Sequence, residues 1–323
     1  MRHFLKVFLI TFFISILLVM VGFYSYLRVF NPLNDIIPIN GVDIKDDDDN
    51  ADDSDATPFE NAVKNSKRIN VLVVGLEHVR TDTIMVASYD IENKIANIIS
   101  IPRDTLYERP GYKSNALKIN AIYQDENIDG LIDAVQKILN IRIDKYITVD
   151  YKAVIEGIDV LGGVEIDIPF HMKYTDPSDN PPLIIDIPEG RRLLDGKTSL
   201  KFLRFRKGDS GYTDYPNGDI GRIQAQQMFV KETVKKLLSL KLPNFIHSVY
   251  PYIKTNFSTT QLIALASELV GFSMENLNTD ILPGTGEWID DISFYVPKNE
   301  EIVKLIYTMY GLLEEENNSG TSE

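Results

Sequence analysis

The sequence predicts an α/β fold, a three-layer α-β-α sandwich with a central mixed sheet, preceded by one transmembrane helix. Two observations predict it. Short apolar runs alternate with segments of helical spacing from residue 68 to residue 310, which indicates strands covered by helices. A run of 21 residues near the amino terminus, 7–27, carries no formal charge, which indicates a membrane span.

Strands are expected at short apolar runs bounded by turn residues. These lie at residues 69–75, 83–89, 94–101, 146–149, 164–168, 200–206 and 294–296. Helices are expected where apolar residues recur at helical spacing. These lie at residues 129–139, 151–160, 220–238, 259–270 and 299–310. Glycine and proline separate the segments, as the pair Gly162 and Gly163 does before the strand that ends at Pro169.

The apolar run 7–27 is long enough to cross a bilayer, because a helix of that length rises about 30 Å. Arg2 and Lys6 precede it and an acidic flank follows it. The positive-inside rule therefore predicts a single-pass protein of the cell membrane, with its amino terminus in the cytoplasm and its domain outside. The alternative is a cleaved signal peptide, whose apolar region is usually shorter and is followed by small residues.

Four segments are expected along the chain. They are a cytoplasmic end and anchor at 1–28, an acidic disordered stalk at 29–66, an extracellular globular domain at 67–313 and a disordered tail at 314–323. In the stalk, seven of the ten residues from 46 to 55 are aspartates, and their mutual repulsion opposes folding.

Composition excludes several classes of function. The formal net charge is −14, whereas a nucleic-acid-binding protein normally presents a basic face. The chain has no cysteine, which excludes disulfides, thiolate catalysis and zinc–thiolate sites. Its four histidines lack the spacing of a histidine metal motif.

The first candidate cluster is the loop 75–83 between two predicted strands. It carries Glu77 and Asp82 beside a glycine turn. Carboxylates at the carboxyl ends of strands are well placed to hold a hard cation such as Mg²⁺. The alternative is a loop capped by its own aspartate and threonine side chains.

The second cluster is Arg103 and Asp104, which follow Pro102 where a predicted strand ends. One interpretation is a surface ion pair worth under about 1 kcal/mol. The other is an arginine for phosphate, beside an aspartate that orients it or accepts a proton. The residue types alone leave both open.

The third cluster gathers arginines. Strand alternation would put Arg204 and Arg206 on one face. Asp219 is expected to cap the long helix, which places Arg222 in its first turn and Gln226 one turn further on. Helix amino termini and guanidinium groups both favour phosphate, so this cluster indicates an anion site. The alternative is a solvated edge strand and a salt bridge within the helix.

Ordered motifs over residues 68–240, the motif core, resemble the LytR–CpsA–Psr family of cell-wall glycopolymer ligases. They are NVLVVGLE…RTDT, ISIPRDT, KINAIY, VLGGVEIDIP, LRFRK and NGDIGRIQAQQ. The later segment LPGTGEWIDDISFYVP is similar to the family's carboxyl-terminal portion. The resemblance implies a phosphotransferase, with a catalytic domain at 67–313 and Mg²⁺ as cofactor. Its implied reaction is transfer of a teichoic acid, capsular or other wall polysaccharide from undecaprenyl pyrophosphate to peptidoglycan, which forms a phosphodiester and releases undecaprenyl phosphate.

The resemblance also assigns roles by position. It implies Glu77 and Asp82 as metal ligands, although family members often carry aspartate at the first of these positions. The residues implied to contact the pyrophosphate are Arg103, Lys118, Arg204, Arg206, Arg222 and Gln226. The implied catalytic residues are Asp82, Arg103 and Asp104.

Two other functions use the same residues. A polyprenyl pyrophosphate hydrolase would replace the acceptor by water, and a non-catalytic scaffold would bind the lipid pyrophosphate without turnover. The sequence does not identify the glycopolymer, the acceptor hydroxyl, the general base, the lipid channel or the oligomeric state.

Overall fold

The structure is a computed structural model that describes residues 58–77, 80–179, 181–238 and 242–313. The expected membrane span at 7–27, most of the stalk and the tail after residue 313 lie outside these ranges. Within the described part of the chain, no helix combines the length and the apolar character that crossing a membrane requires.

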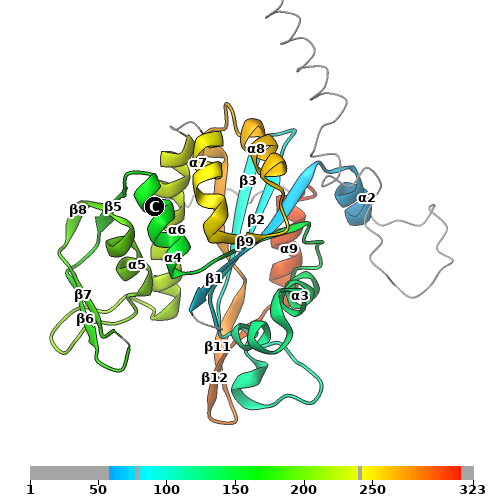
Figure 1. The fold of residues 1–323 in the computed structure, drawn as a ribbon. Helices are drawn as coiled ribbons and strands as arrows, with labels where there is room; N and C mark the ends of the chain where they lie inside the picture. Colours follow the sequence, from blue (N-terminus) through cyan, green and yellow to red (C-terminus); the bar gives the residue numbers. More distant parts are fainter. Residues whose placement is uncertain (1–57, 78–79, 180, 239–241, 314–323) are drawn as a thin grey trace, which may run out of the picture.

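A six-stranded mixed sheet forms the centre of the domain (Figure 1). Its strands, in the order β10-β3-β2-β1-β4-β9, are β10 (Leu277–Ile281), β3 (Ile95–Ile101), β2 (Arg80–Asp90), β1 (Arg68–Glu77), β4 (Lys145–Val149) and β9 (Ile253–Thr255). β1 runs parallel to β4 and β10 parallel to β3, whereas β2 is antiparallel to both of its neighbours. The carboxyl ends of β1, β3, β4 and β10 therefore lie at one edge of the sheet.

Helices cover both faces of this sheet, as the sequence predicts (Figure 1). On one face α2 (Pro58–Asn65), α3 (Ile119–Leu139) and α9 (Asn299–Met309) pack in the same core as Leu72 and Val74 of β1. On the other face α8 (Thr259–Glu268) packs against Ile69 and Val71. The alternation of buried residues along β1 thus creates two separate apolar layers.

A second, smaller core lies beside the sheet and is drawn in green in Figure 1. It contains α4 (Tyr151–Val160), β5 (Val164–Ile168), β6 (Met172–Asp176), β7 (Leu183–Ile187), β8 (Gly190–Leu194), α5 (Gly196–Arg204) and part of α6 (Asp219–Leu238). The strands pair as β5–β8 and β6–β7. In β5 the apolar residues are buried and Glu165 and Asp167 are exposed, because side chains alternate across a strand. This core borders the edge of the sheet where the candidate residues gather.

Two elements complete the domain. α7 (Leu242–Val249) lies near α4 and α8. A two-stranded hairpin, β11 (Gly284–Ile289) and β12 (Ile292–Pro297), extends from the body of the domain (Figure 1). The sequence analysis missed this hairpin except for three residues of β12.

The strand predicted at 200–206 is wrong, because these residues belong to α5 and to the turn after it. The Asp195 side chain caps α5 by accepting a hydrogen bond from Thr198 N, and Ser199 and Phe202 are buried at helical spacing. Arg204 is the last residue of the helix, and Phe205 is extended. Strand alternation therefore does not explain the position of Arg204 and Arg206.

Two other boundaries differ from the prediction. α3 begins at Ile119 and not at 129, with an interruption at Asn127, whose φ is 59°. Its added first turn buries Ile119 and Ile122 against the sheet. The predicted stalk also includes α2, because Phe59 is buried and stacks on Tyr307 with the ring centroids 5.0 Å apart.

Candidate functional site

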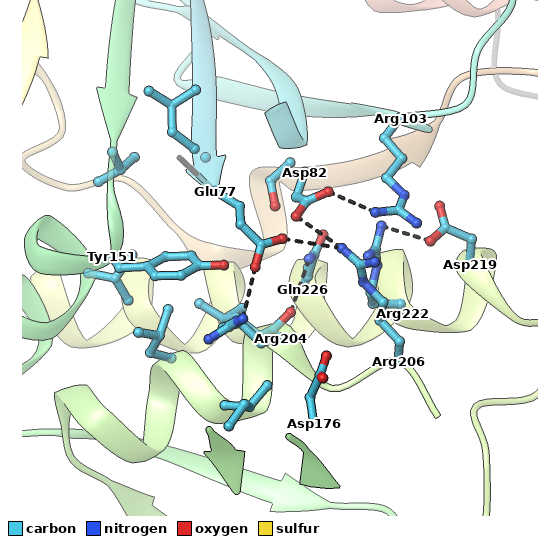
Figure 2. A pocket seen from close by; sticks show the side chains of 18 of the residues that line it. Glu77, Asp82, Arg103, Tyr151, Asp176, Arg204, Arg206, Asp219, Arg222 and Gln226 are labelled. Carbon is cyan, nitrogen blue, oxygen red and sulfur yellow. Dashed lines mark hydrogen bonds and ion pairs between the residues drawn. The ribbon is translucent and has the colours of Figure 1, made fainter. Parts of the chain in front are cut away.

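A cavity of about 490 Å³ opens where the carboxyl ends of β1 and β4 meet the second core. Seven of the nine predicted site residues line it, and they are Glu77, Asp82, Arg103, Arg204, Arg206, Arg222 and Gln226. Figure 2 shows their side chains converging from β1, β2, the loop after β3, α5 and α6. The other two predicted residues, Asp104 and Lys118, do not line the cavity.

Asp82 lies between two arginines (Figure 2). Arg103 Nη1 donates to Asp82 Oδ1 at 2.8 Å, and Arg206 Nη2 donates to Asp82 Oδ2 at 3.0 Å. Arg206 Nη2 also lies 3.6 Å from Glu77 Oε2. The Arg206 guanidinium, just after the end of α5, thus contacts both Asp82 and Glu77.

Glu77 is bound by Arg204, the last residue of α5. Arg204 Nη2 donates to Glu77 Oε1 at 2.8 Å and to Asp179 Oδ2 at 2.9 Å. The guanidinium carbon of Arg204 lies 4.8 Å from the centroid of the Tyr151 ring, within the range of a cation–π contact. The Tyr151 hydroxyl points towards Glu77 (Figure 2), and its interaction with that carboxyl lowers the pKa of Glu77.

The two carboxyl groups titrate as a pair. The hydrogen bond with Asp82 and burial raise the pKa of Glu77. Burial works against ionisation of Asp82 too, but the Glu77 hydrogen bond, Arg206 and Arg103 together lower the pKa of Asp82. Two carboxylates in contact do not both ionise readily without a further cation. Asp82 is therefore the more acidic member of the pair.

Arg222 lies deeper, in the first turn of α6. Its side chain is 4% exposed, and its Nη2 lies 2.7 Å from Asp219 Oδ1. Asp219 is the first residue of the helix and not its cap, so the capping prediction is wrong. Burial, and then the nearby charges of Arg103 and Arg206, lower the pKa of Arg222.

Several donors in this wall are unused. The Nε atoms of Arg103 and Arg222 are buried and have no hydrogen-bond partner among the residues that the structure describes. Gln226, buried one turn after Arg222, donates from Nε2 to Leu203 O at 3.4 Å. Because buried donors are nearly always paired, this wall is suited to an anion that offers several oxygens.

Comparison with known proteins now identifies the family. The model of the LytR_cpsA_psr family matches residues 37–310. The chain belongs to this family. In Bacillus subtilis strain 168, TagV is named a polyisoprenyl-teichoic acid–peptidoglycan teichoic acid transferase, and the two proteins are 27% identical over 241 residues, 71% of this chain and 60% of TagV.

Two further likenesses agree with the assignment. Biofilm regulatory protein A of Streptococcus mutans serotype c is 25% identical over 233 residues, 69% of this chain and 56% of that protein. The chain thus spans less than two thirds of either relative. The crystal structure of B. subtilis TagV has a TM-score of 0.64 and 25% identity, and the match covers 77% of this chain and 99% of that one.

The LytR–CpsA–Psr resemblance implied Mg²⁺, and the site can be tested against it. Within the described residues, no three or more Asp, Glu, His or Cys side chains are close enough to form a metal cage. Mg²⁺ usually needs only one or two carboxylates, because water and substrate phosphates supply its other ligands. The pair Glu77 and Asp82 fits that pattern, because it supplies two carboxylates at the cavity and leaves the other ligand positions to water and phosphate.

Asp104 and Lys118 pair with each other beside the cavity, with 3.2 Å between Nζ and Oδ1. The Lys118 Nζ also lies 5.7 Å from the centroid of the Phe294 ring. Their implied roles in this LytR–CpsA–Psr protein, orienting Arg103 and contacting phosphate, stay predictions.

Three residues of the site were missed by sequence reasoning. Tyr151 follows β4, which is parallel to β1, so the rule that parallel strands end at one edge could have found it. Asp179 lies in the β6–β7 connection, where no residue pattern indicates a role in the site. Gln227 donates from Nε2 to Ser100 Oγ at 3.1 Å and to Asp280 O at 2.8 Å. These bonds fix α6 against β3 and β10.

Proposed function

We propose that this LytR–CpsA–Psr protein is a phosphotransferase that moves a glycopolymer from undecaprenyl pyrophosphate to peptidoglycan, outside the cell membrane. One observation carries the proposal. Arginines from three separate segments, Arg103, Arg206 and Arg222, converge on one cavity beside two contacting carboxylates. The name of the similar protein TagV, a teichoic acid transferase, supports the same reaction class.

Charge in the cavity supports a pyrophosphate donor bound together with a cation. Five basic side chains line the cavity, and they are Arg103, Arg204, Arg206, Lys207 and Arg222. Five acidic side chains line it too, and they are Glu77, Asp82, Asp150, Asp176 and Asp219. The formal charges cancel, so a ligand with several negative charges is best bound with a cation of its own.

The reaction places an acceptor hydroxyl in line with the glycan-linked phosphorus. The acceptor oxygen bonds to that phosphorus while the bond to the bridging pyrophosphate oxygen breaks. The products are a glycan–phosphate–peptidoglycan diester, undecaprenyl phosphate and the proton of the hydroxyl. The transferred phosphoryl group keeps its charge on oxygens that face the guanidinium groups.

Each arginine has a distinct task in this proposal. Arg222 and Arg103 line the cavity and offer guanidinium donors to phosphate oxygens. Arg206, with a side chain 43% exposed, is the most accessible of the four arginines that line the cavity, and it neutralises the leaving phosphate. Arg204 holds Glu77 in place and is itself fixed by Asp179 and Tyr151.

Glu77 and Asp82 would hold Mg²⁺, whose positive charge would help to neutralise the pyrophosphate. Arg103 and Arg206 orient Asp82 from both of its oxygens. Since Asp82 has the lower pKa, it is the first of the pair to offer a charged ligand.

The test uses the full chain in detergent micelles with a lipid-pyrophosphate-linked glycan, Mg²⁺ and peptidoglycan fragments. Glycan attachment and polyprenyl phosphate release are followed together. We expect release that depends on the acceptor and is lost in Arg222→Ala, while Arg192→Ala, an exposed arginine outside the cavity, behaves as wild type. Release without acceptor would indicate a hydrolase, and binding without release a scaffold.

A further inference from the structure

The β11–β12 hairpin carries the only tryptophan of the chain, Trp288. Its side chain is 78% exposed, the largest exposed fraction among the large apolar residues of the described chain. The hairpin turn is formed by Asp290 and Asp291, whose φ angles are 49° and 62°. These angles match a type I′ turn, which joins two strands tightly. The indole therefore lies beside the turn of a regular hairpin, residues 284–297, which we call the arm, and not on an irregular loop.

This arm belongs to the same edge of the sheet as the candidate site. β10 ends at Ile281 on that edge and β11 begins at Gly284. At the base of the arm, Tyr295 N donates to Asp104 O at 2.9 Å, and Leu106 N donates to Tyr295 O at 2.8 Å. The segment held in this way directly follows Arg103, which lines the cavity.

One face of the arm has an unusual shape. Trp288, Gly286 and Gly284 share this face by alternation, and Tyr295 lies opposite Gly286 in the register. A Cβ at Gly284 would lie 2.5 Å from the Tyr295 ring, whereas a Cβ at Gly286 would meet no atom of the described residues within 4 Å. The Tyr295 hydroxyl donates to Leu282 O at 2.6 Å, which fixes the ring. The backbone at Gly286 is therefore uncovered, and this gap, the open step, lies between the fixed Tyr295 ring and the exposed Trp288 indole.

The step fits a flat ligand with an apolar face and a polar rim. A pyranose ring has this form, because its axial C–H groups make the face and its hydroxyls the rim. Aromatic side chains combine apolar area with a negatively polarised face that attracts C–H groups. Bare backbone at Gly286 lets such a ring lie flat beside the indole.

Charge selects among possible partners. Asp290 and Asp291 form the turn one residue beyond the strand position after Trp288, and Glu287 lies on the opposite face of the same strand. These carboxylates repel polyanions such as phosphate-rich polymers and anionic lipid surfaces. An uncharged sugar chain meets no such repulsion.

We infer that the face formed by Trp288, Gly286 and Tyr295 is a docking surface for the sugar rings of the acceptor glycan strand. The identity of the acceptor as peptidoglycan rests on the proposed function. A six-residue strand is about 20 Å long, which exceeds a single sugar ring. A polymeric acceptor can therefore bind at the tip and extend to the cavity at Arg103, whereas a short acceptor reaches the cavity without the arm.

Because Trp288 is the only tryptophan, the intrinsic emission of the whole protein reports on this one position. The probe is an uncharged β-1,4-linked N-acetylglucosamine hexamer added to the full chain in detergent. We expect a saturable blue shift of the emission as the sugar covers the indole. No shift at any sugar concentration, or the same shift with zwitterionic lipid vesicles in place of sugar, would overturn the inference.

Variants extend the test to affinity, measured by calorimetry with the same hexamer. Trp288→Ala should weaken binding by about tenfold or more, the size expected for losing one stacked aromatic group, and Trp288→Tyr should retain most of it. Gly286→Val should also weaken binding, because it fills the open step while the strand tolerates valine. Val270→Ala, another exposed apolar position at 70% exposure, is the matched control and should bind as wild type.

Kinetics separates this inference from the proposed function. Trp288→Ala should raise KM for polymeric acceptor about tenfold and leave kcat, and the KM for a disaccharide acceptor, unchanged. Transfer with an unaltered polymer KM would overturn the docking surface and leave the transferase standing. A wild-type protein that binds the hexamer through Trp288 but transfers nothing would keep the sugar-binding surface and remove the transferase.

Discussion

Arg204 donates a 2.8 Å hydrogen bond to Glu77, a residue 127 positions earlier in the chain. The bond joins the end of α5, in the second core, to the end of β1, in the central sheet. Glu77 and Arg204 are 28% and 19% exposed, so water screens the pair only in part. The site is therefore assembled at the contact between two cores and depends on their docking.

Replacement of Arg222 should abolish most of the activity. Arg222→Ala removes a buried donor whose Nε has no protein partner, and we expect kcat/KM to fall at least about a hundredfold, as for loss of one preorganised donor. Arg222→Lys should recover little, because an ammonium cannot reproduce the guanidinium fork. Steady-state kinetics on both variants checks this, and activity within threefold of wild type in Arg222→Ala would remove Arg222 from the mechanism.

The carboxylate pair should control the response to Mg²⁺. Asp82→Asn should raise the Mg²⁺ concentration for half-maximal activity at least about tenfold, and Glu77→Gln should raise it less, because Asp82 is the more acidic member of the pair. Binding of Mn²⁺, followed by electron paramagnetic resonance, gives a reading independent of turnover. Glu165→Gln, on the exposed side of β5, is the control. Unchanged Mn²⁺ affinity in Asp82→Asn would place the metal elsewhere.

Tyr151→Phe should move the pH profile. The Tyr151 hydrogen bond lowers the pKa of Glu77, against the larger effects of Asp82 and burial that raise it. Removal of the hydroxyl should therefore raise the pKa of Glu77 further and shift the acid limb of the rate profile to higher pH. The phenyl ring keeps its place under Arg204, so stability should change little. A profile identical to that of wild type would show that Glu77 ionisation does not govern the rate.

Asp144 should make stability depend on pH. Burial raises its pKa from 3.8 to about 6, although Asn70 N donates to it and Arg142 lies near. The protonated form is thus favoured by folding, so its contribution is complete below about pH 4 and is lost as the pH rises through about 6. The difference between the two pKa values corresponds to roughly 3 kcal/mol.

The measurement is urea denaturation from pH 4 to pH 8. Asp144→Asn should flatten the decline between pH 4 and pH 6.5 and should be more stable than wild type at pH 8. An equal slope in both proteins would show that Asp144 titrates normally.

Gly196 should tolerate no side chain. A Cβ there would lie 2.2 Å from the Ile155 carbonyl oxygen, which is backbone of α4 and cannot move aside easily. Gly196→Ala should lower the free energy of unfolding by about 1–3 kcal/mol, the usual effect of overpacking. Gly157→Ala, in the same helix pair but with no contact under 3.9 Å, should be neutral or slightly stabilising. Thermal denaturation of both variants checks the difference, and equal melting temperatures would contradict it.

Four strands of the central sheet could be predicted from the sequence, because β1, β2, β3 and β4 are apolar runs ended by clear turn residues. The segment 200–206 was predicted incorrectly because Leu203 and Phe205 alternate with arginines, which imitates a strand. The helical signal lies earlier, in the Asp195 cap and the buried Ser199 and Phe202. A local pattern of seven residues could not distinguish these alternatives.

The candidate site was predictable in its residues more than in its geometry. Arg204 and Arg206 meet the carboxylates, but the reason is a helix end followed by an extended turn. Asp104 and Lys118 do not line the cavity, because the chain turns after Pro102 and these two side chains pair with each other. That turn is set by pairing with β12, almost two hundred residues later, which no local pattern encodes.

Gln227 has a consequence for protein engineering. Its side chain is bound on two sides, to Ser100 and to the backbone of Asp280, so α6 cannot roll about its own axis without breaking a buried bond. A designer who transplants this pocket by copying only cavity-lining residues would leave Gln227 behind, because it lines no part of the cavity. The transplanted helix would then keep Arg222, but the side chain of Arg222 would no longer point into the pocket.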